Sequence, residues 1–187
     1  MLMSLINILR LKQEEFYKNK QMKKIFITVL FLLIAVSCEN KREKVQRDGE
    51  PDVVLVETED DEMNTAIESA KKTFKSDFHQ ALLSKNPNFS NFTIKQKFDT
   101  PSGGGEHIWI GDIIFDNGKY HGIIQNEPME SIGVKLGDEV VVNVENISDW
   151  MYYDINKVKG AYTVKVLRKT MSDEEKKQMD SQGLIYE

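Results

Sequence analysis

The hydrophobic period of this chain changes at residues 86–88, and that change limits which fold classes the chain can adopt. Before it, apolar residues recur every three or four positions, as on one face of an amphipathic helix. They are Met63, Ile67, Ala70, Phe74, Phe78 and Leu82. After it, apolar and polar residues alternate through residues 92–98, as in a half-buried strand. A helix followed by strands predicts an α+β fold, with one N-terminal amphipathic helix packed on a curved antiparallel sheet.

Local signals set the expected ends of these elements. Asp60 or Asp61 can cap the start of the helix, and the helix is expected to end before Pro87. Asn117-Gly118 is a strong hairpin signal between two strand-like runs. Strands are expected at residues 53–56, 106–115, 120–125, 140–144 and 161–167, and a short exposed helix with a Ser-x-x-Glu cap at residues 172–182.

The N-terminal part of the chain has the features of a secretory signal. A basic start at residues 22–24 precedes the apolar run 25–36, which is shorter than the ~20 residues that span a bilayer. The run ends in Ala-Val-Ser-Cys, and this ending resembles the bacterial lipobox, in which the cysteine is acylated and becomes the new N-terminus. The alternative is a membrane-anchoring helix in which Cys38 is incidental.

This interpretation divides the chain into four parts. Residues 1–37 are the signal segment, in which residues 1–21 are either a start assigned too early, before Met22, or a presequence. Residues 38–52 are the lipidated Cys38 and a polar tether, residues 53–170 the α+β domain, and residues 171–187 a charged tail with a short helix. The predicted location is the cell envelope, with the membrane reached through lipid at Cys38 and the domain facing the periplasm or the cell exterior. The sequence Glu-Asn-Lys after Cys38 lacks the Asp associated with inner-membrane retention and favours the outer membrane.

Charge and cysteine content exclude several classes of function. Residues 38–187 contain 19 Lys and Arg against 28 Asp and Glu, a net charge of −9, so nucleic acid is not an expected partner. The single cysteine excludes an internal disulfide framework and a cysteine-rich zinc module. No cofactor and no metal is predicted.

Hairpin geometry groups the candidate site residues by sheet face. In a regular two-residue hairpin Trp109 pairs with Asn126, and His107 lies on the same face as Trp109, whereas His121 lies on the opposite face near Asp112. A bulge would shift this parity. One hypothesis is a ligand pocket formed by His107, Trp109 and Asn126. The alternative is that His107 and Asn126 satisfy loop backbone groups while Trp109 belongs to the core.

A second cluster of candidate residues follows at Asp149 and Trp150. Bulky amphipathic side chains here can form a recognition surface. The alternative is that Trp150 and Tyr152 alternate into the core while Asp149 caps a turn after Ser148.

Several spaced motifs between residues 61 and 168 resemble the bacterial YegJ-like family, a domain of unknown function. They are EHIW at 106–109, GIIQNEP at 122–128, GDEV at 137–140 and ISDWMY at 147–152, together with the helix at 63–78 and the segment 162–168. The resemblance implies no activity, substrate or catalytic residue.

Two functions are compatible with these features. The first is a non-enzymatic, lipid-anchored binding module for a small molecule, a peptide or an envelope protein, with His107, Trp109, Asn126, Asp149 and Trp150 as ligand-binding residues. The alternative is an envelope hydrolase that uses His107, or the pair Asp112 and His121, as acid and base.

Overall fold

The computed structural model describes residues 42–47, 50–56 and 60–186. Cys38 and the predicted signal segment lie outside the described residues. The chain divides into two compact units, residues 1–54 and 55–187, and each is described by itself. None of the helices in the described ranges is long and apolar enough to cross a membrane.

Strands β1 (Arg42–Arg47) and β2 (Glu50–Val56) form a two-stranded sheet of their own. The strand expected at residues 53–56 is present within β2. In contrast, β1 lies in the segment expected to be a tether. Strand pairing satisfies backbone hydrogen-bonding groups whatever the side chains are, so a polar composition does not prevent it.

The expected N-terminal helix is present as three consecutive helical segments: α2 (Asp61–Thr73), a π-helical turn η2 (Phe74–Phe78) and α3 (His79–Ser84). Asp60 caps α2 by accepting a hydrogen bond from the backbone N–H of Met63 at 3.0 Å. The helix ends at Lys85 in the left-handed conformation (φ 51°), two residues before Pro87. Both predicted ends of this helix are confirmed.

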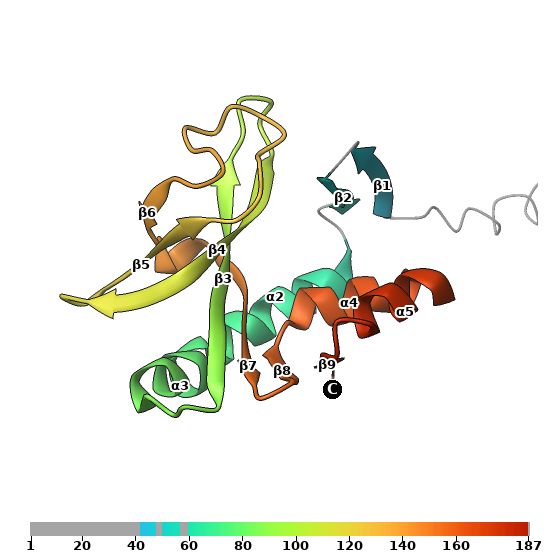
Figure 1. The fold of residues 1–187 in the computed structure, drawn as a ribbon. Helices are drawn as coiled ribbons and strands as arrows, with labels where there is room; N and C mark the ends of the chain where they lie inside the picture. Colours follow the sequence, from blue (N-terminus) through green and yellow to red (C-terminus); the bar gives the residue numbers. More distant parts are fainter. Residues whose placement is uncertain (1–41, 48–49, 57–59, 187) are drawn as a thin grey trace, which may run out of the picture. The chain divides into compact units, whose positions relative to one another are not determined.

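A seven-stranded sheet follows, in the order β6-β5-β4-β3-β7-β8-β9 (Figure 1). Its strands are β3 (Phe89–Asp99), β4 (Gly105–Asp116), β5 (Lys119–Ile124), β6 (Glu139–Val141), β7 (Ile147–Asp154), β8 (Lys157–Gly160) and β9 (Ile185–Tyr186). All neighbouring strands are antiparallel except β8 and β9, which are parallel. The α+β class predicted from the sequence is confirmed.

The strand expected at residues 161–167 is wrong, because this segment forms helix α4 (Tyr162–Thr170). Its buried residues Thr163 and Val166 are three positions apart, which is helical spacing. Ala161 turns the chain between β8 and α4 with a left-handed φ of 53°. Helix α5 (Asp173–Asp180) confirms the predicted C-terminal helix and carries the Ser172–Glu175 capping box. The expected strand 140–144 ends early, and its last residue begins the 3-10 turn η3 (Val144–Asn146).

The β4–β5 hairpin contains a bulge that changes the expected side-chain faces. Its turn is the predicted one, with positive φ at Asn117 and Gly118, and Ile114 pairs with His121 as expected. At Asp112 (φ 51°) the register shifts by one, so Ile110 pairs with Ile124. Asn126 is therefore not the partner of Trp109. The prediction that His107 and His121 lie on opposite faces is wrong as well. The extra residue in β4 reverses the alternation of side chains, and both histidines therefore lie on the same face.

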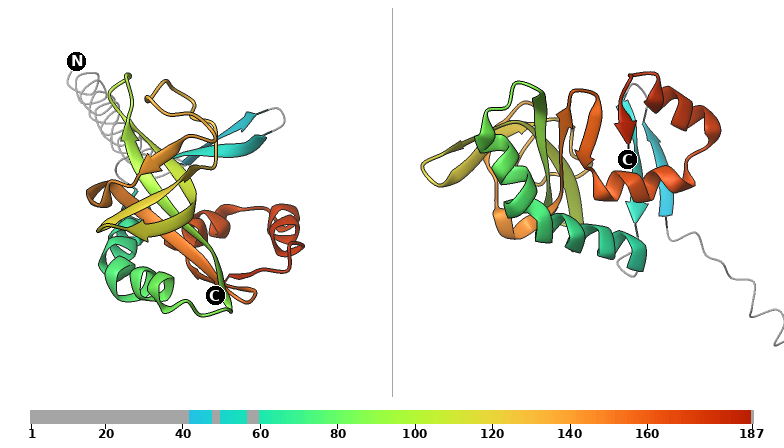
Figure 2. Two further views of the ribbon diagram at one scale, coloured as in Figure 1. Left: turned by 60° about the vertical axis from the view of Figure 1, so that its left-hand side comes forward. Right: turned by 90° about the horizontal axis from the view of Figure 1, so that it is seen from below.

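The hydrophobic core lies between the sheet and the segment α2–η2–α3. Figure 2 shows this helical segment along one side of the strands. The ring of Phe74 meets Tyr120 edge-on with centroids 5.1 Å apart, and the indole N–H of Trp150 donates to the Ala70 carbonyl at 2.8 Å. A smaller cluster of Met63, Ala66 and Val166 joins α2 to α4. Each large side chain buried in this way contributes about 1.5–3 kcal/mol.

Candidate functional site

Three polar or aromatic side chains form a row across the sheet on the face opposite the core. Trp109 of β4 pairs with Lys95 of β3, and Lys95 pairs with Asp149 of β7. His107, Ser148 and Thr163 surround this row through hydrogen bonds. We refer to these six residues as the Lys95 cluster: Lys95, His107, Trp109, Ser148, Asp149 and Thr163.

An irregularity in β7 places two consecutive side chains in this cluster. The β3–β7 register changes between Lys95, which pairs with Asp149, and Gln96, which pairs with Ile147. Ser148 is the extra residue, and its hydroxyl lies 2.8 Å from Nδ1 of His107 and 3.3 Å from the Lys95 carbonyl oxygen. The bulge therefore directs both Ser148 and Asp149 towards the outer face.

Asp149 is fully buried, with 0 % exposure, and both of its carboxylate oxygens are used. Oδ1 accepts from the backbone N–H groups of Trp150 and Tyr162, and Oδ2 accepts from the backbone N–H and the hydroxyl of Thr163. Burial raises the pKa of this carboxyl, against the opposing effects of these hydrogen bonds and of Lys95. Because the side chain of Ala161 cannot cap α4, Asp149 of strand β7 accepts the first N–H groups of this helix instead.

Lys95 is partly buried and lies between Thr163 and Trp109. Its ammonium nitrogen is 3.5 Å from the Thr163 hydroxyl and 5.0 Å from the centre of the Trp109 ring. Burial lowers the pKa of this lysine, while the negative charge of Asp149 acts in the opposite direction. Among the described residues no carboxylate forms an ion pair with Lys95. Its charge is thus only indirectly compensated.

His107 lies at the edge of the cluster and is exposed to solvent. Partial loss of hydration, which disfavours the charged imidazolium, lowers its pKa to about 4 together with the positive charges of Lys95 and Lys97. The imidazole is therefore neutral at pH 7. Serine and histidine are the residue types of an activated nucleophile, but Ser148 is only 2 % exposed, and in the described part of the chain no carboxylate is bonded to this imidazole.

The other predicted residues, which are Asn126, Trp150, Asp112 and His121, lie outside the cluster. The side-chain oxygen of Asn126 accepts the backbone N–H of Trp109 at 2.9 Å, so Asn126 extends the β4–β5 pairing as a loop residue. Trp150 is 1 % exposed and belongs to the core, as the alternative interpretation of this segment expected. Asp112 is the bulge residue, and no hydrogen bond joins it to His121 within the described hairpin. The structure thus brings together His107, Trp109 and Asp149.

The sequence did not indicate Lys95, Ser148 or Thr163 as site residues. Lys95 alternates with apolar residues along its strand, which is also the pattern of a solvent-facing lysine. Thr163 reaches the site because the first turn of α4 is hydrogen-bonded to Asp149 of β7, and this segment was expected to be a strand. Within the described ranges no group of three or more His, Cys, Asp or Glu residues could hold a metal ion.

Comparison with known proteins finds bacterial relatives of this chain. It is 34% identical over 113 residues to the uncharacterised protein YegJ of Escherichia coli K12, which covers 60% of this chain and 71% of that protein. It is 33% identical over 139 residues to a putative ankyrin repeat protein of Neisseria meningitidis serogroup B, covering 71% of this chain. The match spans 55% of that relative, so the chain corresponds to about half of its length.

No solved structure matches the chain significantly. The profile of the family DUF2314, described as uncharacterised proteins conserved in bacteria, matches residues 60–186. This range contains α2 to β9, and with them the whole Lys95 cluster. The resemblance to YegJ noted in the sequence is therefore confirmed, and the chain belongs to the DUF2314 family.

Proposed function

We propose that this protein is a lipid-anchored binding module of the cell envelope, and that the Lys95 cluster binds the carboxylate or phosphate group of a ligand. The observation that carries this proposal is the state of Lys95, a partly buried cation with no ion-pair partner among the described residues. Its nearest acidic neighbour, Asp149, already accepts four hydrogen bonds.

An anionic ligand group would supply the missing counter-charge. Charge pairs are stronger where surrounding protein replaces water, and a hydrogen bond to a charged group contributes about 1.5–3 kcal/mol. Trp109 beside Lys95 offers a flat wall for an apolar part of the ligand. Nδ1 of His107 is held by Ser148, which leaves Nε2 of the neutral ring to contact a polar ligand atom.

Titration with inorganic phosphate tests this proposal. Trp109 fluorescence should change on binding, because Lys95 lies over its ring. We expect Lys95→Met to weaken phosphate binding at least about tenfold, which corresponds to ~1.4 kcal/mol, whereas the exposed hairpin lysine variant Lys119→Met should bind as the unaltered protein does. A folded Lys95→Met protein that binds phosphate as tightly as the Lys119→Met control would overturn the proposal, as would no binding at all.

The lipid anchor is a separate part of the proposal and is supported by the signal-like run and the lipobox-like ending at Cys38. Metabolic labelling of cells with a palmitate analogue should modify the full-length protein and should be lost in Cys38→Ala. A Cys38→Ala protein that is still labelled would contradict acylation at this residue. Separation of inner and outer membranes would then test the expected outer-membrane location.

A further inference from the structure

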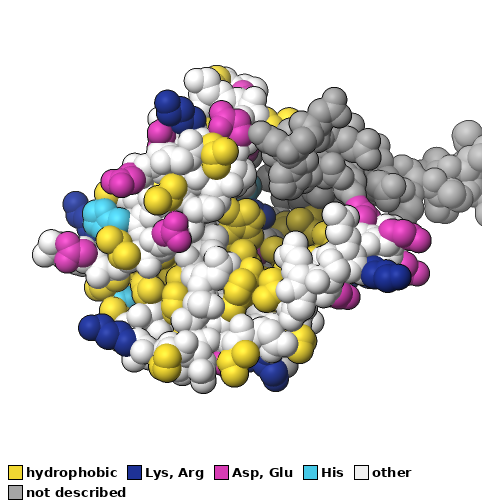
Figure 3. All heavy atoms as spheres, in the orientation of Figure 1, with side chains coloured by type: hydrophobic (Ala, Val, Ile, Leu, Met, Phe, Trp, Pro, Cys, Tyr) yellow, Lys and Arg dark blue, Asp and Glu magenta, His cyan; other side chains and the backbone are white. Residues whose placement is uncertain are grey.

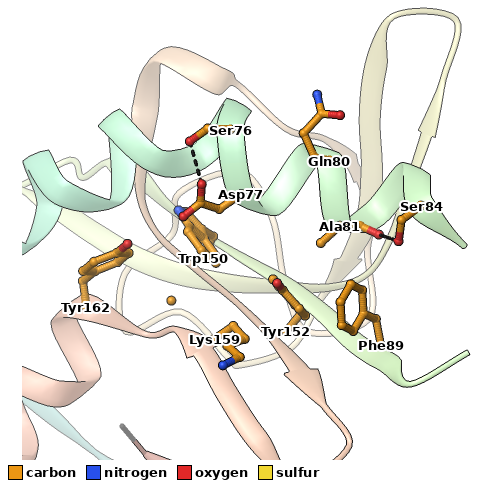
Figure 4. A pocket seen from close by; sticks show the side chains of 11 residues that line it. Ser76, Asp77, Gln80, Ala81, Ser84, Phe89, Trp150, Tyr152, Lys159 and Tyr162 are labelled. Carbon is orange, nitrogen blue, oxygen red and sulfur yellow. Dashed lines mark hydrogen bonds between the residues drawn. The ribbon is translucent and has the colours of Figure 1, made fainter. Parts of the chain in front are cut away.

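A second hollow lies on the other side of β7 from the Lys95 cluster. It has a volume of about 450 Å³ and opens between the helical segment η2–α3 and the strands β7 and β8 (Figure 4). Asp77, Gln80, Ala81 and Ser84 form one wall, because they share a helical stripe. Trp150 and Asp149 are consecutive on β7 and point to opposite faces, so the two sites are separate.

The walls of this pocket carry opposite charges. Asp77 projects from the helical wall and accepts a hydrogen bond from the Ser76 hydroxyl at 2.7 Å. Lys159 lines the pocket from β8 (Figure 4). Tyr152 lines the pocket as well, and burial, the charge of Asp154 and the charge of Asp77 raise its pKa. A negative and a positive group thus flank the same space.

Aromatic side chains line the pocket between these charges. The planes of Trp150 and Tyr152 differ by 11°, with centroids 6.1 Å apart, and Tyr162 meets Trp150 edge-on. Phe89 adds a ring that tilts against Tyr152 at 5.0 Å. Figure 3, which shows the face seen in Figure 1, has hydrophobic side chains gathered at the centre of the described surface and charged ones towards its margins.

The helical wall has an unusual backbone at this point. In η2 the N–H of His79 reaches the carbonyl of Phe74, which widens the turn by one residue. Phe74 and Phe78 remain stacked in the core at 5.1 Å, while Ser76 and Asp77 line the pocket. Single π-helical turns are uncommon and frequently occur at functional sites, which is independent support for a binding role.

We propose that this pocket binds a small zwitterion of the amino acid type. Its ammonium group would pair with Asp77, its carboxylate would face Lys159, and an apolar side chain would contact Tyr152 and Phe89. The volume lies within the range of small-molecule sites. This inference does not depend on the Lys95 cluster, and its test uses a different ligand and different residues.

Three related probes separate the two charges. L-phenylalanine carries both, N-acetyl-L-phenylalanine lacks the ammonium, and L-phenylalaninamide lacks the carboxylate. In NMR titrations of the unaltered protein we expect L-phenylalanine to bind at least about tenfold more tightly than N-acetyl-L-phenylalanine, since a charge-assisted hydrogen bond is lost. L-phenylalaninamide should also bind more weakly. Shifted amide signals should come from η2, β7 and β8.

Asp77→Asn should weaken L-phenylalanine binding about tenfold and leave the affinity for N-acetyl-L-phenylalanine unchanged. The matched control is Glu68→Gln, which removes an exposed carboxylate from α2 that does not line the pocket. Equal affinity for all three probes, no binding of L-phenylalanine at about 10 mM, or equal losses in Asp77→Asn and Glu68→Gln would each overturn the proposal.

Discussion

The two faces of the central strands carry opposite chemistry within the same few residues. On the inner face Ile94, Ile108 and Trp150 pack against the helical segment as a continuous apolar core. On the outer face their chain neighbours Lys95 and Asp149 are polar, and Asp149 is as deeply buried as the core residues. Burial alone therefore does not distinguish the two faces. The inner face stabilises the fold through apolar burial, whereas the outer face holds polar groups in place through hydrogen bonds.

The largest effect is expected for the inner face. Trp150→Ala should lower the free energy of unfolding by about 4 kcal/mol, because it leaves a cavity and removes the hydrogen bond to the Ala70 carbonyl. Trp109→Ala on the outer face should cost only about 1 kcal/mol, since this partly exposed ring leaves no closed cavity. Urea unfolding monitored by circular dichroism measures both. Equal losses would show that the two faces do not differ in their contribution to stability.

The outer face should depend on hydrogen bonding to Asp149. Asp149→Ala should cost about 2–3 kcal/mol, because it leaves the first N–H groups of α4 and the Thr163 hydroxyl without their acceptor. Asp149→Asn retains one acceptor oxygen and should cost less. Hydrogen exchange at Tyr162 and Thr163 should be faster in both variants. If the alanine variant unfolds at the same urea concentration as the unaltered protein, Asp149 is not the cap of α4.

Regular periodicity allowed much of the fold to be predicted. The helix from Met63 and the turn at Asn117-Gly118 depend on local pattern and local turn chemistry, and both are present as expected. The segment 161–167 was assigned wrongly because its apolar residues alternate, whereas its actual helix depends on a cap from Asp149, which lies on β7. A cap supplied from another element leaves no signal near the helix in the sequence.

The candidate site was predictable only in part, for the same reason. His107 and Trp109 share a face in any register, because they are two residues apart on one strand. Their relation to Asn126 depended on the register of β5, which the bulge at Asp112 shifts. Lys95 became a site residue only through its position between β4 and β7, and strand order is not encoded in the alternation of a single strand.

An intermediate effect is expected for the pH dependence of stability. His107 has a pKa of about 4 in the folded protein, below its ordinary value of 6.5. Between these values the unfolded chain binds a proton that the folded protein does not, so stability should fall as pH decreases from 6.5 to 4. Because the ring is partly open to solvent, we expect this loss to be about 1 kcal/mol rather than the full value of the shift.

His107→Gln should reduce this loss between pH 6.5 and 4 in urea unfolding experiments. Asp149 acts in the opposite direction, because its raised pKa favours the folded state as pH falls, but both proteins contain it. The difference between the two pH profiles therefore isolates the imidazole. Identical profiles would show that neither the surroundings of the ring nor the charges of Lys95 and Lys97 lower its pKa.

The smallest effect concerns the bulge that determines which residues of β4 face each side. Asp112 has a left-handed φ of 51°, a conformation that glycine adopts without steric cost. Asp112→Gly should therefore raise the free energy of unfolding by about 0.5 kcal/mol, since relief of strain exceeds the added freedom of the unfolded chain. Asp116→Gly is the matched control, because Asp116 pairs regularly with Lys119 and glycine there should destabilise the hairpin. If both variants lose stability equally, the left-handed conformation of Asp112 stores no strain that glycine relieves, and the bulge does not cost the fold the free energy assigned to it here.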